Sequence, residues 1–380
     1  MVKIKKLTRF VIKYSLMTKP DRKYKIALIG DCLANGGAEK VHSLLSLYFQ
    51  KAGLEVHNCV FVDWIQYEYA GSLLNLGKIH APTAVTRKFK RFFELKNFIN
   101  DTNFDAVIDF RMRTGLLQEL LISKYCYPKK TYYTVHSGIL AFYFPKSSAW
   151  SKLIYKDKKI VAVSKAIQAA VVSKGLAENA FQIYNPIDLE SITTSKNAYD
   201  VSEGKYIMAV GRMNEEVKQF DKLIEAYSKS VLPNKKIKLI LLGDGQKQSE
   251  YKALSEKLGL KDLVVFKGFQ KNPFPYYQNA LFTVLSSINE GFPNVILESF
   301  AVGTPVVSFD CFSGPNEIII DRKNGLLVAN QDFAQLIEVM NLLVEDAELR
   351  EHCKQNTKTS VKPFEIETIG KQWLELLKIK

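Results

Sequence analysis

The sequence predicts an α/β protein made of two domains, each built on a parallel sheet with helices between the strands. The chain has 380 residues, which is long for one hydrophobic core, so two domains of roughly 200 residues or fewer are expected. Short apolar runs alternate with segments of helical spacing in both halves, as in βαβ units. Residues 189–204 are polar and weakly patterned, which is typical of a domain boundary.

The order of the apolar runs gives the expected elements of each half. Strands are predicted at residues 25–30, 57–62, 105–110, 131–135, 159–164 and 181–185, and then at 206–211, 237–242, 263–268, 281–287 and 305–310. Helices are predicted at 38–51, 87–100 and 116–125, and then at 295–302, 333–344 and 365–379. We therefore expect a first domain at 1–190, a second at 204–360 and a C-terminal helical segment at 361–380.

The composition is that of a globular protein without a metal or disulfide framework. Hydrophobic residues make up 47% and charged residues 24% of the chain, and no apolar run reaches the roughly 18 residues of a membrane span. The N-terminus has no secretory signal pattern. The five cysteines form no C-x-x-C pair, and the five histidines lack metal-ligand spacing. We expect reduced thiols, a cytoplasmic location and no bound metal.

The net charge of +14 calls for an anionic partner. No nucleic-acid-binding module is recognisable, so nucleic acid is not expected. Residues 1–23 hold eight Lys or Arg, with Leu7, Phe10, Val11 and Tyr14 at helical spacing, and Arg87–Phe93 again combines cations with aromatics. Such stretches favour peripheral association with the anionic inner face of the cell membrane. The alternative is a solvated tail and an ordinary core-facing helix.

The segment from Glu290 to Glu298 lies between an apolar strand and a helix. Gly291 and Pro293 interrupt the chain, and the amides of residues 294–296 then begin a helix at the carboxyl end of a parallel sheet. Bare amides and the helix dipole favour a phosphate there. Two carboxylates would repel that phosphate, so we expect them to bind neutral hydroxyls while cations hold the charge. A sugar nucleotide meets this demand, although a solvated pair of glutamates is the common alternative.

The segment Glu290-Gly-Phe-Pro-Asn-Val-Ile-Leu-Glu298 resembles the E-x7-E motif of retaining family 4 glycosyltransferases, which have the GT-B fold. Further similar segments are Gly36-Gly-Ala-Glu39, "VAVSKA", "IYNPID" and Gly211-Arg212 with Lys218. The loop Cys311–Glu317 is similar to one found in enzymes that build bacterial surface polysaccharides. The resemblance covers roughly residues 25–375. It implies the GT-B arrangement of two Rossmann-like domains, each with a doubly wound parallel sheet, that face a central cleft. It also implies a final strand at 324–328 and a last helix that crosses back to the first domain.

This resemblance implies roles for particular residues. Glu290 would hold the donor sugar, Glu298 the ribose, and Arg212 and Lys218 the diphosphate as charge develops on it. His136, at the end of a first-domain strand, would lie beside the transferred sugar. The remaining donor-binding residues would be Gly36, Gly37, Gly268, Phe269, Phe292, Pro293, Asn294 and Val295.

Arg111 and Arg113 follow the end of another predicted strand. Their position puts two cations at the ligand edge of the first sheet, so they are candidates for binding a phosphate of the acceptor.

Together these features predict a retaining glycosyltransferase. It would move a hexose or N-acetylhexosamine from a nucleotide sugar, with UDP favoured, to a saccharide or polyprenyl-phosphate-linked acceptor of a cell-surface polysaccharide or glycolipid. The chain has no Asp-x-Asp, so no metal or other cofactor is expected. The alternatives are a sugar-nucleotide epimerase or phosphorylase on the same fold, a hydrolase, and a basic binding protein without catalysis.

Overall fold

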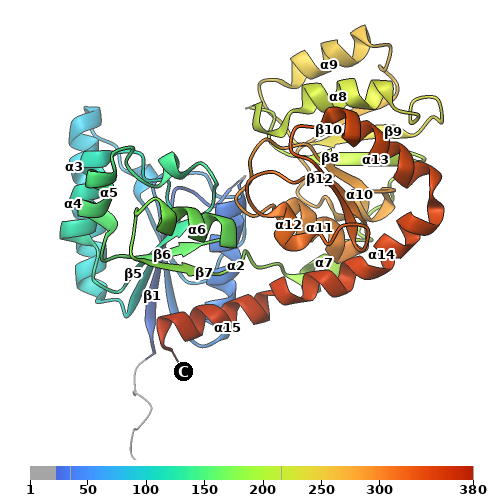
Figure 1. Ribbon diagram of the computed structural model, residues 1–380. Helices are drawn as coiled ribbons and strands as arrows, with labels where there is room; N and C mark the ends of the chain where they lie inside the picture. Colours follow the sequence, from blue (N-terminus) through green and yellow to red (C-terminus); the bar gives the residue numbers. More distant parts are fainter. Residues whose placement is uncertain (1–22, 35, 215, 380) are drawn as a thin grey trace, which may run out of the picture.

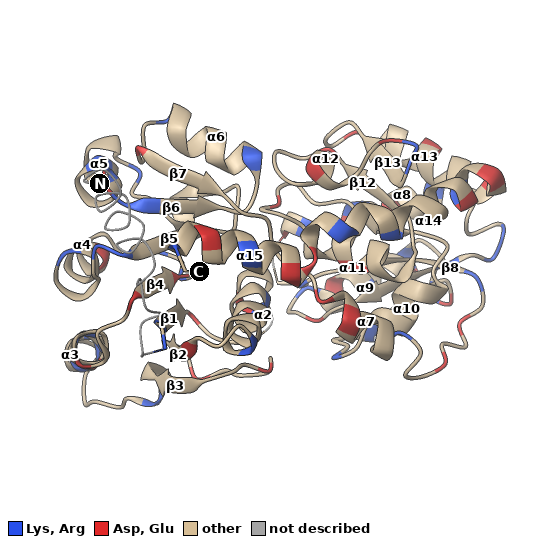
Figure 2. Cartoon of the chain, turned by 90° about the horizontal axis from the view of Figure 1, so that it is seen from below, with Lys and Arg blue, Asp and Glu red and all other residues tan. Residues whose placement is uncertain are grey.

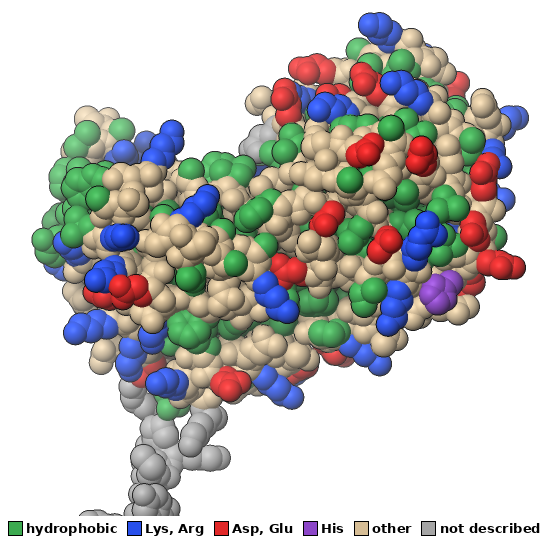
Figure 3. Space-filling model, in the orientation of Figure 1, with side chains coloured by type: hydrophobic (Ala, Val, Ile, Leu, Met, Phe, Trp, Pro, Cys, Tyr) green, Lys and Arg blue, Asp and Glu red, His purple; other side chains and the backbone are tan. Residues whose placement is uncertain are grey.

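The computed structural model describes residues 23–34, 36–214 and 216–379, which form two α/β domains side by side (Figure 1). The basic amphipathic stretch predicted over residues 1–23 lies outside this range apart from Lys23. On one side of the molecule the surface is hollowed between the domains (Figure 3).

The first domain is built on a parallel sheet that has seven strands among the described residues. The strand order is β3-β2-β1-β4-β5-β6-β7, so the chain reverses direction across the sheet next to β1. The strands are β1 (Lys25–Gly30), β2 (Glu55–Val60), β3 (Ser72–Asn75), β4 (Ala106–Asp109), β5 (Thr131–Val135), β6 (Lys159–Ala162) and β7 (Asn179–Gln182). The helices are α2 (Gly37–Lys51), α3 (Ala84–Thr102), α4 (Leu116–Leu121), α5 (Ser148–Tyr155) and α6 (Lys165–Ser173).

Helices cover both faces of this sheet because successive strand residues point to opposite sides. Ala27 and Ile29 of β1 pack in a core with Leu95 of α3. Ile26 and Leu28 pack on the other face, in a core with residues of α2 and of the C-terminal helix. The strands are thus buried on both sides, which explains their continuous apolar runs.

The second domain repeats this plan on a parallel sheet with six strands among the described residues, in the order β10-β9-β8-β11-β12-β13. The strands are β8 (Tyr206–Val210), β9 (Lys238–Leu242), β10 (Val264–Gly268), β11 (Thr283–Leu285), β12 (Val306–Phe309) and β13 (Gly325–Val328). The helices are α8 (Phe220–Lys229), α9 (Gln248–Lys257), α10 (Phe274–Asn279), α11 (Asn294–Val302), α12 (Pro315–Ile318), α13 (Phe333–Glu345) and α14 (Ala347–Val361).

The chain crosses between the domains at two neighbouring segments. The amide of Ile187 donates to the carbonyl of Phe364 (2.8 Å), and the amide of Ile366 donates back to Ile187 (2.9 Å). Helix α15 (Ile366–Leu377) then runs along the underside of the first domain (Figures 1 and 2). Its Ile369 and Trp373 are buried in the same core as residues of α2.

The fold class is as predicted, but several elements have no counterpart among the sequence predictions, namely strand β3 and helices α5, α6, α7 (Leu189–Ser195), α8, α9, α10, α12 and α14. Strand β3 is short and only partly buried, so it leaves no apolar run. Helix α14 has few buried residues. Helix α7 lies inside the polar segment that was predicted to be a domain boundary. Asp188 is the N-cap of this helix, and its side chain accepts a hydrogen bond from the amide of Ser191 (2.9 Å).

Candidate functional site

The loops after β5 and β11 meet between the domains. The amide of Gly138 donates to the carbonyl of Glu290 (3.2 Å). A Cβ at position 291 would lie 2.0 Å from the carbonyl oxygen of His136. Only glycine permits this approach of two backbones. The fold thus brings His136 and Glu290, which are far apart in the sequence, to one place.

Lys218 and Glu290 form an ion pair at this place, with Nζ 2.5 Å from Oε1. Both side chains are largely shielded, with exposed fractions of 22% and 13%. The chain before Lys218 forms a short 3₁₀ turn at Glu216–Lys218, fixed to the end of β11 by two hydrogen bonds: the amide of Ile288 donates to Val217 (2.9 Å), and Ser286 Oγ donates to the carbonyl of Lys218 (2.8 Å). The cation and the carboxylate therefore act as one unit.

Arg212 is exposed on the loop that follows β8. The turn after β9 supports this loop: Met213 and Asp244 are joined by an amide–carbonyl bond of 2.9 Å, as are Lys247 and Met213. The turn approaches closely because Gly243 has a φ of +127°, where a Cβ would lie 2.0 Å from the carbonyl of Gly211. The Gly-Asp-Gly turn thus serves as a support for Arg212.

Helix α11 begins at Asn294 with Pro293 as its N-cap, so the amides of residues 294 and 295 have no intrahelical acceptor, whereas the amide of Ile296 donates to the carbonyl of Pro293 (3.0 Å). Asn185, from the first domain, fixes this end: its Nδ2 donates to the carbonyl of Phe292 (3.2 Å) and to Asn294 Oδ1 (2.9 Å). The Phe292 ring stacks on Tyr184 (4.8 Å) and is buried. The sequence predicts that Phe292 contacts the donor. The structure corrects this prediction, because the side chain of Phe292 packs between the domains.

Glu298 lies farther along α11, beside half-buried Val295. Tyr277 Oη donates to Glu298 Oε2 (3.0 Å). Burial raises the pKa of Glu298, while this hydrogen bond and the charges of Lys40 and Lys218 oppose the rise. Tyr277 was not foreseen from the sequence, because nothing distinguishes it from the other apolar residues around α10.

Gly36 is the N-cap of α2, and Gly37 faces the second domain: a Cβ on Gly37 would lie 3.5 Å from Asn294 Nδ2. The carboxylate of Glu39 folds back over Gly36, 2.0 Å from where a Cβ would stand. Burial raises the pKa of Glu39, and Arg212 opposes this rise. Because a carboxylate already occupies this helix end, the turn suits sugar hydroxyls better than a phosphate.

His136 is held in a row of rings. Its ring lies 5.7 Å from that of Phe110, and Phe110 stacks on His42 at 5.0 Å. Burial, with Arg113 nearby, lowers the pKa of His136 to about 3. The imidazole is therefore neutral at physiological pH and can donate one hydrogen bond but carries no charge.

The structure corrects the expectation that Arg111 and Arg113 bind an acceptor phosphate. Both are only 2% exposed. Arg111 is paired with Asp109 (2.9 Å) and Glu119 (3.1 Å). Arg113 donates to the carbonyl of Thr134 (3.0 Å) among buried tyrosine rings, including Tyr143. Both guanidinium groups are therefore engaged inside the first domain, Arg111 with two carboxylates and Arg113 with a carbonyl and aromatic rings.

Gly268 ends β10 with a φ of +66°, and its carbonyl accepts from the amide of Gly243 (2.8 Å). Phe269 follows and is 48% exposed. This strand is at the edge of the second sheet, and the exposed ring offers an apolar face near the support of Arg212.

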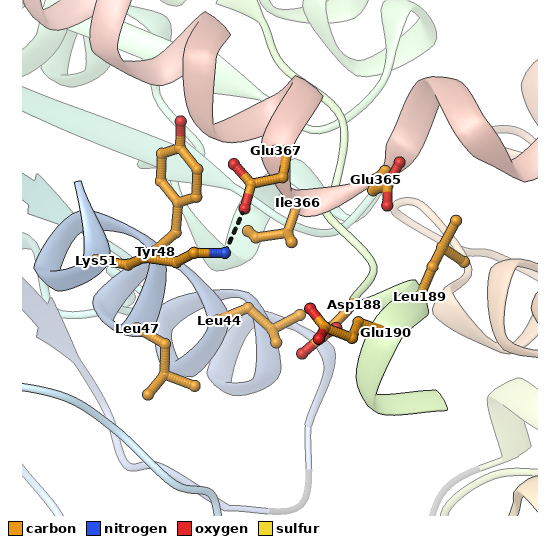
Figure 4. Close-up of a pocket in the computed structure, with 10 residues that line it drawn as sticks. All are labelled: Leu44, Leu47, Tyr48, Lys51, Asp188, Leu189, Glu190, Glu365, Ile366 and Glu367. Carbon is orange, nitrogen blue, oxygen red and sulfur yellow. Dashed lines mark hydrogen bonds and ion pairs between the residues drawn. The ribbon is translucent and has the colours of Figure 1, made fainter. Parts of the chain in front are cut away.

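A cavity of about 130 Å³ lies at the underside of the molecule, between α2, α7 and α15 (Figure 4). Its lining includes four carboxylates, and Lys51 is paired with one of them, Glu367, at 2.9 Å. The carboxylates would repel a diphosphate, so this cavity is not the donor site. Its lining residues are Leu44, Leu47, Tyr48, Lys51, Asp188, Leu189, Glu190, Glu365, Ile366 and Glu367.

The residues that the structure describes contain no group of three or more His, Cys, Asp or Glu placed to hold a metal ion. No helix within them has both the length and the apolarity that crossing a membrane requires.

His42 gives the fold a predicted pH dependence. Burial lowers its pKa from 6.5 to about 4, so the unfolded chain takes up a proton below pH 6.5 that the folded chain does not. Stability is then present above that pH and is lost as the pH falls towards 4. From pH 7 to pH 5 we expect His42 to account for about 2 kcal/mol of the decrease in unfolding free energy. Denaturant unfolding of the wild type and His42→Gln at both pH values tests this; an equal decrease in both proteins contradicts it.

Comparison with known proteins identifies the second domain. Residues 191–360 match the family described as Glycosyl transferases group 1. A Campylobacter jejuni protein, N-acetylgalactosamine-N,N'-diacetylbacillosaminyl-diphospho-undecaprenol 4-alpha-N-acetylgalactosaminyltransferase, is 28% identical over 93% of this chain and 99% of its own. The Salmonella typhimurium lipopolysaccharide 1,6-galactosyltransferase is 25% identical over 80% of this chain and 85% of its own.

Solved structures share the fold of the whole chain. Anabaena HepE in complex with UDP-glucose superposes with a TM-score of 0.75 at 20% identity, covering 93% of this chain and 99% of that one. The match over residues 191–360 identifies a domain similar to the glycosyl transferases group 1 family and, together with relatives that align along most of the chain, shows that the chain is a glycosyltransferase.

Proposed function

We propose that this glycosyltransferase moves a hexose or N-acetylhexosamine from a UDP-sugar to a saccharide carried on a polyprenyl phosphate, with retention of anomeric configuration. The observation that carries the proposal is the contact between Lys218 and Glu290, 2.5 Å apart, beside the first amides of α11. A cation for phosphate and a carboxylate for hydroxyls at one helix end match the two halves of a sugar nucleotide.

The donor would lie mainly on the second domain. Its diphosphate would be bound by Arg212, Lys218 and the amides at the start of α11, and its ribose by Glu298. The exposed ring of Phe269 would lie against the base. When the donor binds, the ion pair between Glu290 and Lys218 would break, and Glu290 would accept hydrogen bonds from the sugar hydroxyls instead.

In the transfer step the glycosidic C–O bond to the diphosphate breaks and a C–O bond to the acceptor hydroxyl forms on the same face of the sugar. The leaving phosphate would take the acceptor proton, so no separate base is required. Arg212 and Lys218 stabilise the negative charge that develops on the leaving group. Neutral His136 can donate to a sugar hydroxyl without adding charge, and the first-domain loop beside it helps to exclude water.

The acceptor class is supported by the relatives. The Campylobacter jejuni protein acts, by its name, on a diphospho-undecaprenol-linked sugar, and the Salmonella typhimurium protein on lipopolysaccharide. The turn at Gly36-Gly37 and the carboxylate of Glu39 would face acceptor or donor hydroxyls from the first domain.

A donor screen tests this function. Purified protein is incubated in EDTA with a polyprenyl-diphosphate-linked saccharide and each of several UDP-, GDP- and dTDP-sugars, and products are read by mass spectrometry. We expect a product that is one hexose or N-acetylhexosamine heavier with a UDP-sugar only. Product only after Mg²⁺ is added would contradict the metal-free proposal, while turnover without any acceptor to a new sugar nucleotide or a sugar phosphate would favour an epimerase or phosphorylase.

The proposed partner also includes an anionic membrane surface, where a polyprenyl-linked acceptor resides. On α3, Val85, Phe89 and Phe93 are spaced four residues apart and are 62%, 60% and 55% exposed. Phe92, another ring of the Arg87–Phe93 stretch, packs partly into the core. Figure 3 shows hydrophobic side chains gathered over the region of α3 to α5, with Lys and Arg beside them. This pairing suits an anionic lipid interface.

Vesicle sedimentation tests the membrane contact. We expect Phe89→Ser/Phe93→Ser to bind vesicles of phosphatidylglycerol about tenfold more weakly, because two exposed rings no longer enter the interface. Phe312→Ser is the matched control, since Phe312 is similarly exposed on the second domain. A protein starting at Tyr24 measures the contribution of the N-terminal basic stretch. Equal binding by the wild type and the double variant would contradict a role for α3.

A further inference from the structure

We propose that Glu317 of the second domain is a positioning residue that fastens the two domains together and thereby sets the location of Glu290 against His136. Glu317 lies on α12, at the end of the loop Cys311–Glu317. The proposed donor chemistry assigns no role to this loop. The inference rests on the proposed function for its catalytic consequence, although the fastening itself does not.

Glu317 caps a helix of the other domain. Its Oε2 accepts from the amide of Lys165 (2.9 Å), and its Oε1 accepts from the amide of Ala166 (3.2 Å), the first two residues of α6. The third amide, of Ile167, donates to Ser164 Oγ (3.1 Å). A helix has such unpaired amides at its start, and a carboxylate there also interacts favourably with the helix dipole. The cap of this first-domain helix is thus shared between the two domains.

Two further contacts reinforce the cap. Tyr184, also on the first-domain side, donates its hydroxyl to Glu317 Oε2 (3.0 Å). Ser164 Oγ lies 2.6 Å from Ser313 Oγ, and both serines are buried. The loop is therefore joined to the first domain at both of its ends.

The same loop is joined to the donor-binding segment. Ser313 Oγ donates to the carbonyl of Gly291 (2.6 Å). A Cβ on Gly314 would lie 2.4 Å from Pro293 Cδ, so the loop packs directly on residues 291–293. A continuous set of contacts thus runs from α6 through Ser164 and Ser313 to Gly291, the residue after Glu290.

When Glu317 leaves α6, two helix amides and a tyrosine hydroxyl lose a charged acceptor at once. The hydrogen bonds of Glu317 therefore favour the observed arrangement of the two domains over one in which the domains have moved apart. Water can replace these hydrogen bonds only in part. Without Glu317 the second domain should sample a wider range of orientations, and Glu290 should face the sugar less often in the productive geometry. Donor binding, which the second domain provides, should be little changed.

The experiment combines a distance measurement with kinetics. Single cysteines replace exposed Lys174 in the first domain and Lys261 in the second and carry spin labels; the five native cysteines are buried and should not react. Pulsed dipolar spectroscopy compares the wild type, Glu317→Ala and Glu317→Gln, with Glu256→Ala as control, because Glu256 is exposed on α9. Melting temperatures show that each variant is folded, and UDP affinity is measured by calorimetry.

We expect one narrow distance in the wild type and control, a broad distribution in Glu317→Ala and an intermediate one in Glu317→Gln, which keeps one acceptor oxygen. The value of kcat for transfer should fall roughly 10- to 100-fold in Glu317→Ala, with UDP affinity unchanged and a larger share of donor hydrolysed by water. An unchanged distance distribution in Glu317→Ala overturns the fastening role, and a loss of UDP affinity parallel to kcat overturns the positioning role. If the wild type shows no transfer but the distances still broaden, the fastening stands and the proposed function fails.

Discussion

Glu290→Gln is expected to lower kcat for glycosyl transfer by about 10²- to 10³-fold, the effect of removing one preorganised transition-state contact. UDP affinity should be equal or somewhat tighter. In the structure Glu290 Oε1 is paired with Lys218 Nζ at 2.5 Å. Loss of the carboxylate charge in Glu290→Gln therefore releases Lys218 to bind the diphosphate. It also removes the repulsion between this carboxylate and the diphosphate. Turnover assays together with calorimetry of UDP alone measure the two effects separately.

Two variants serve as comparisons. Glu298→Gln should weaken UDP binding, because its carboxylate, fixed by Tyr277 Oη at 3.0 Å, is assigned to the ribose. Glu216→Gln is the matched control, since Glu216 is a carboxylate on the turn that carries Lys218, and its side chain is 79% exposed and paired with Lys247. If Glu290→Gln loses UDP and Glu298→Gln keeps it, the two roles are reversed.

Arg212→Ala and Lys218→Ala should each reduce kcat/KM by a factor that corresponds to about 1.5–3 kcal/mol of transition-state binding. Both cations face the charge that develops on the leaving diphosphate. The Lys218 variant should be the more damaged of the two, because it also leaves the carboxylate of Glu290, 13% exposed, without its cation. Lys247→Ala provides a control cation from the neighbouring turn.

A double-mutant cycle separates these contributions. If Lys218 and Glu290 act as one unit, the combined Lys218→Ala/Glu290→Gln variant should be less impaired than the product of the two single effects. Wild-type-like kcat/KM in both single cation variants would contradict the diphosphate assignment.

The fold class was predictable because the strands of both sheets are buried on two faces. Runs such as residues 26–30 and 206–210 therefore contain no charged side chain, and helical spacing between such runs predicts crossovers. Elements with few buried residues have no clear apolar pattern in the sequence: β3 is only partly buried, and α14 contributes few core residues. Their positions follow from packing against elements that are distant in the sequence.

The backbone around the candidate site was predictable where the local sequence determines it. The break at Gly291 and Pro293 precedes the start of α11 after β11, as predicted, whereas the ion pair between Lys218 and Glu290 was not predicted. The contacts of Tyr277 and Glu317 are made across long sequence separations, and no local pattern marks them. Arg111 and Arg113 show the converse case: a strand end predicted exposed cations, but Asp109 and Glu119 draw Arg111 into the interior.

Retention at the site formed by Glu290, Lys218 and Arg212 is tested most directly by the anomeric configuration of the first product. Proton NMR is recorded during transfer from an α-linked UDP-sugar identified in the donor screen, before any slower side reaction can change the product. We expect an α-linked product from the wild type and a greatly reduced amount of the same product from Glu290→Gln. A β-linked product, or an α-linked product formed equally fast by Glu290→Gln, would contradict this expectation.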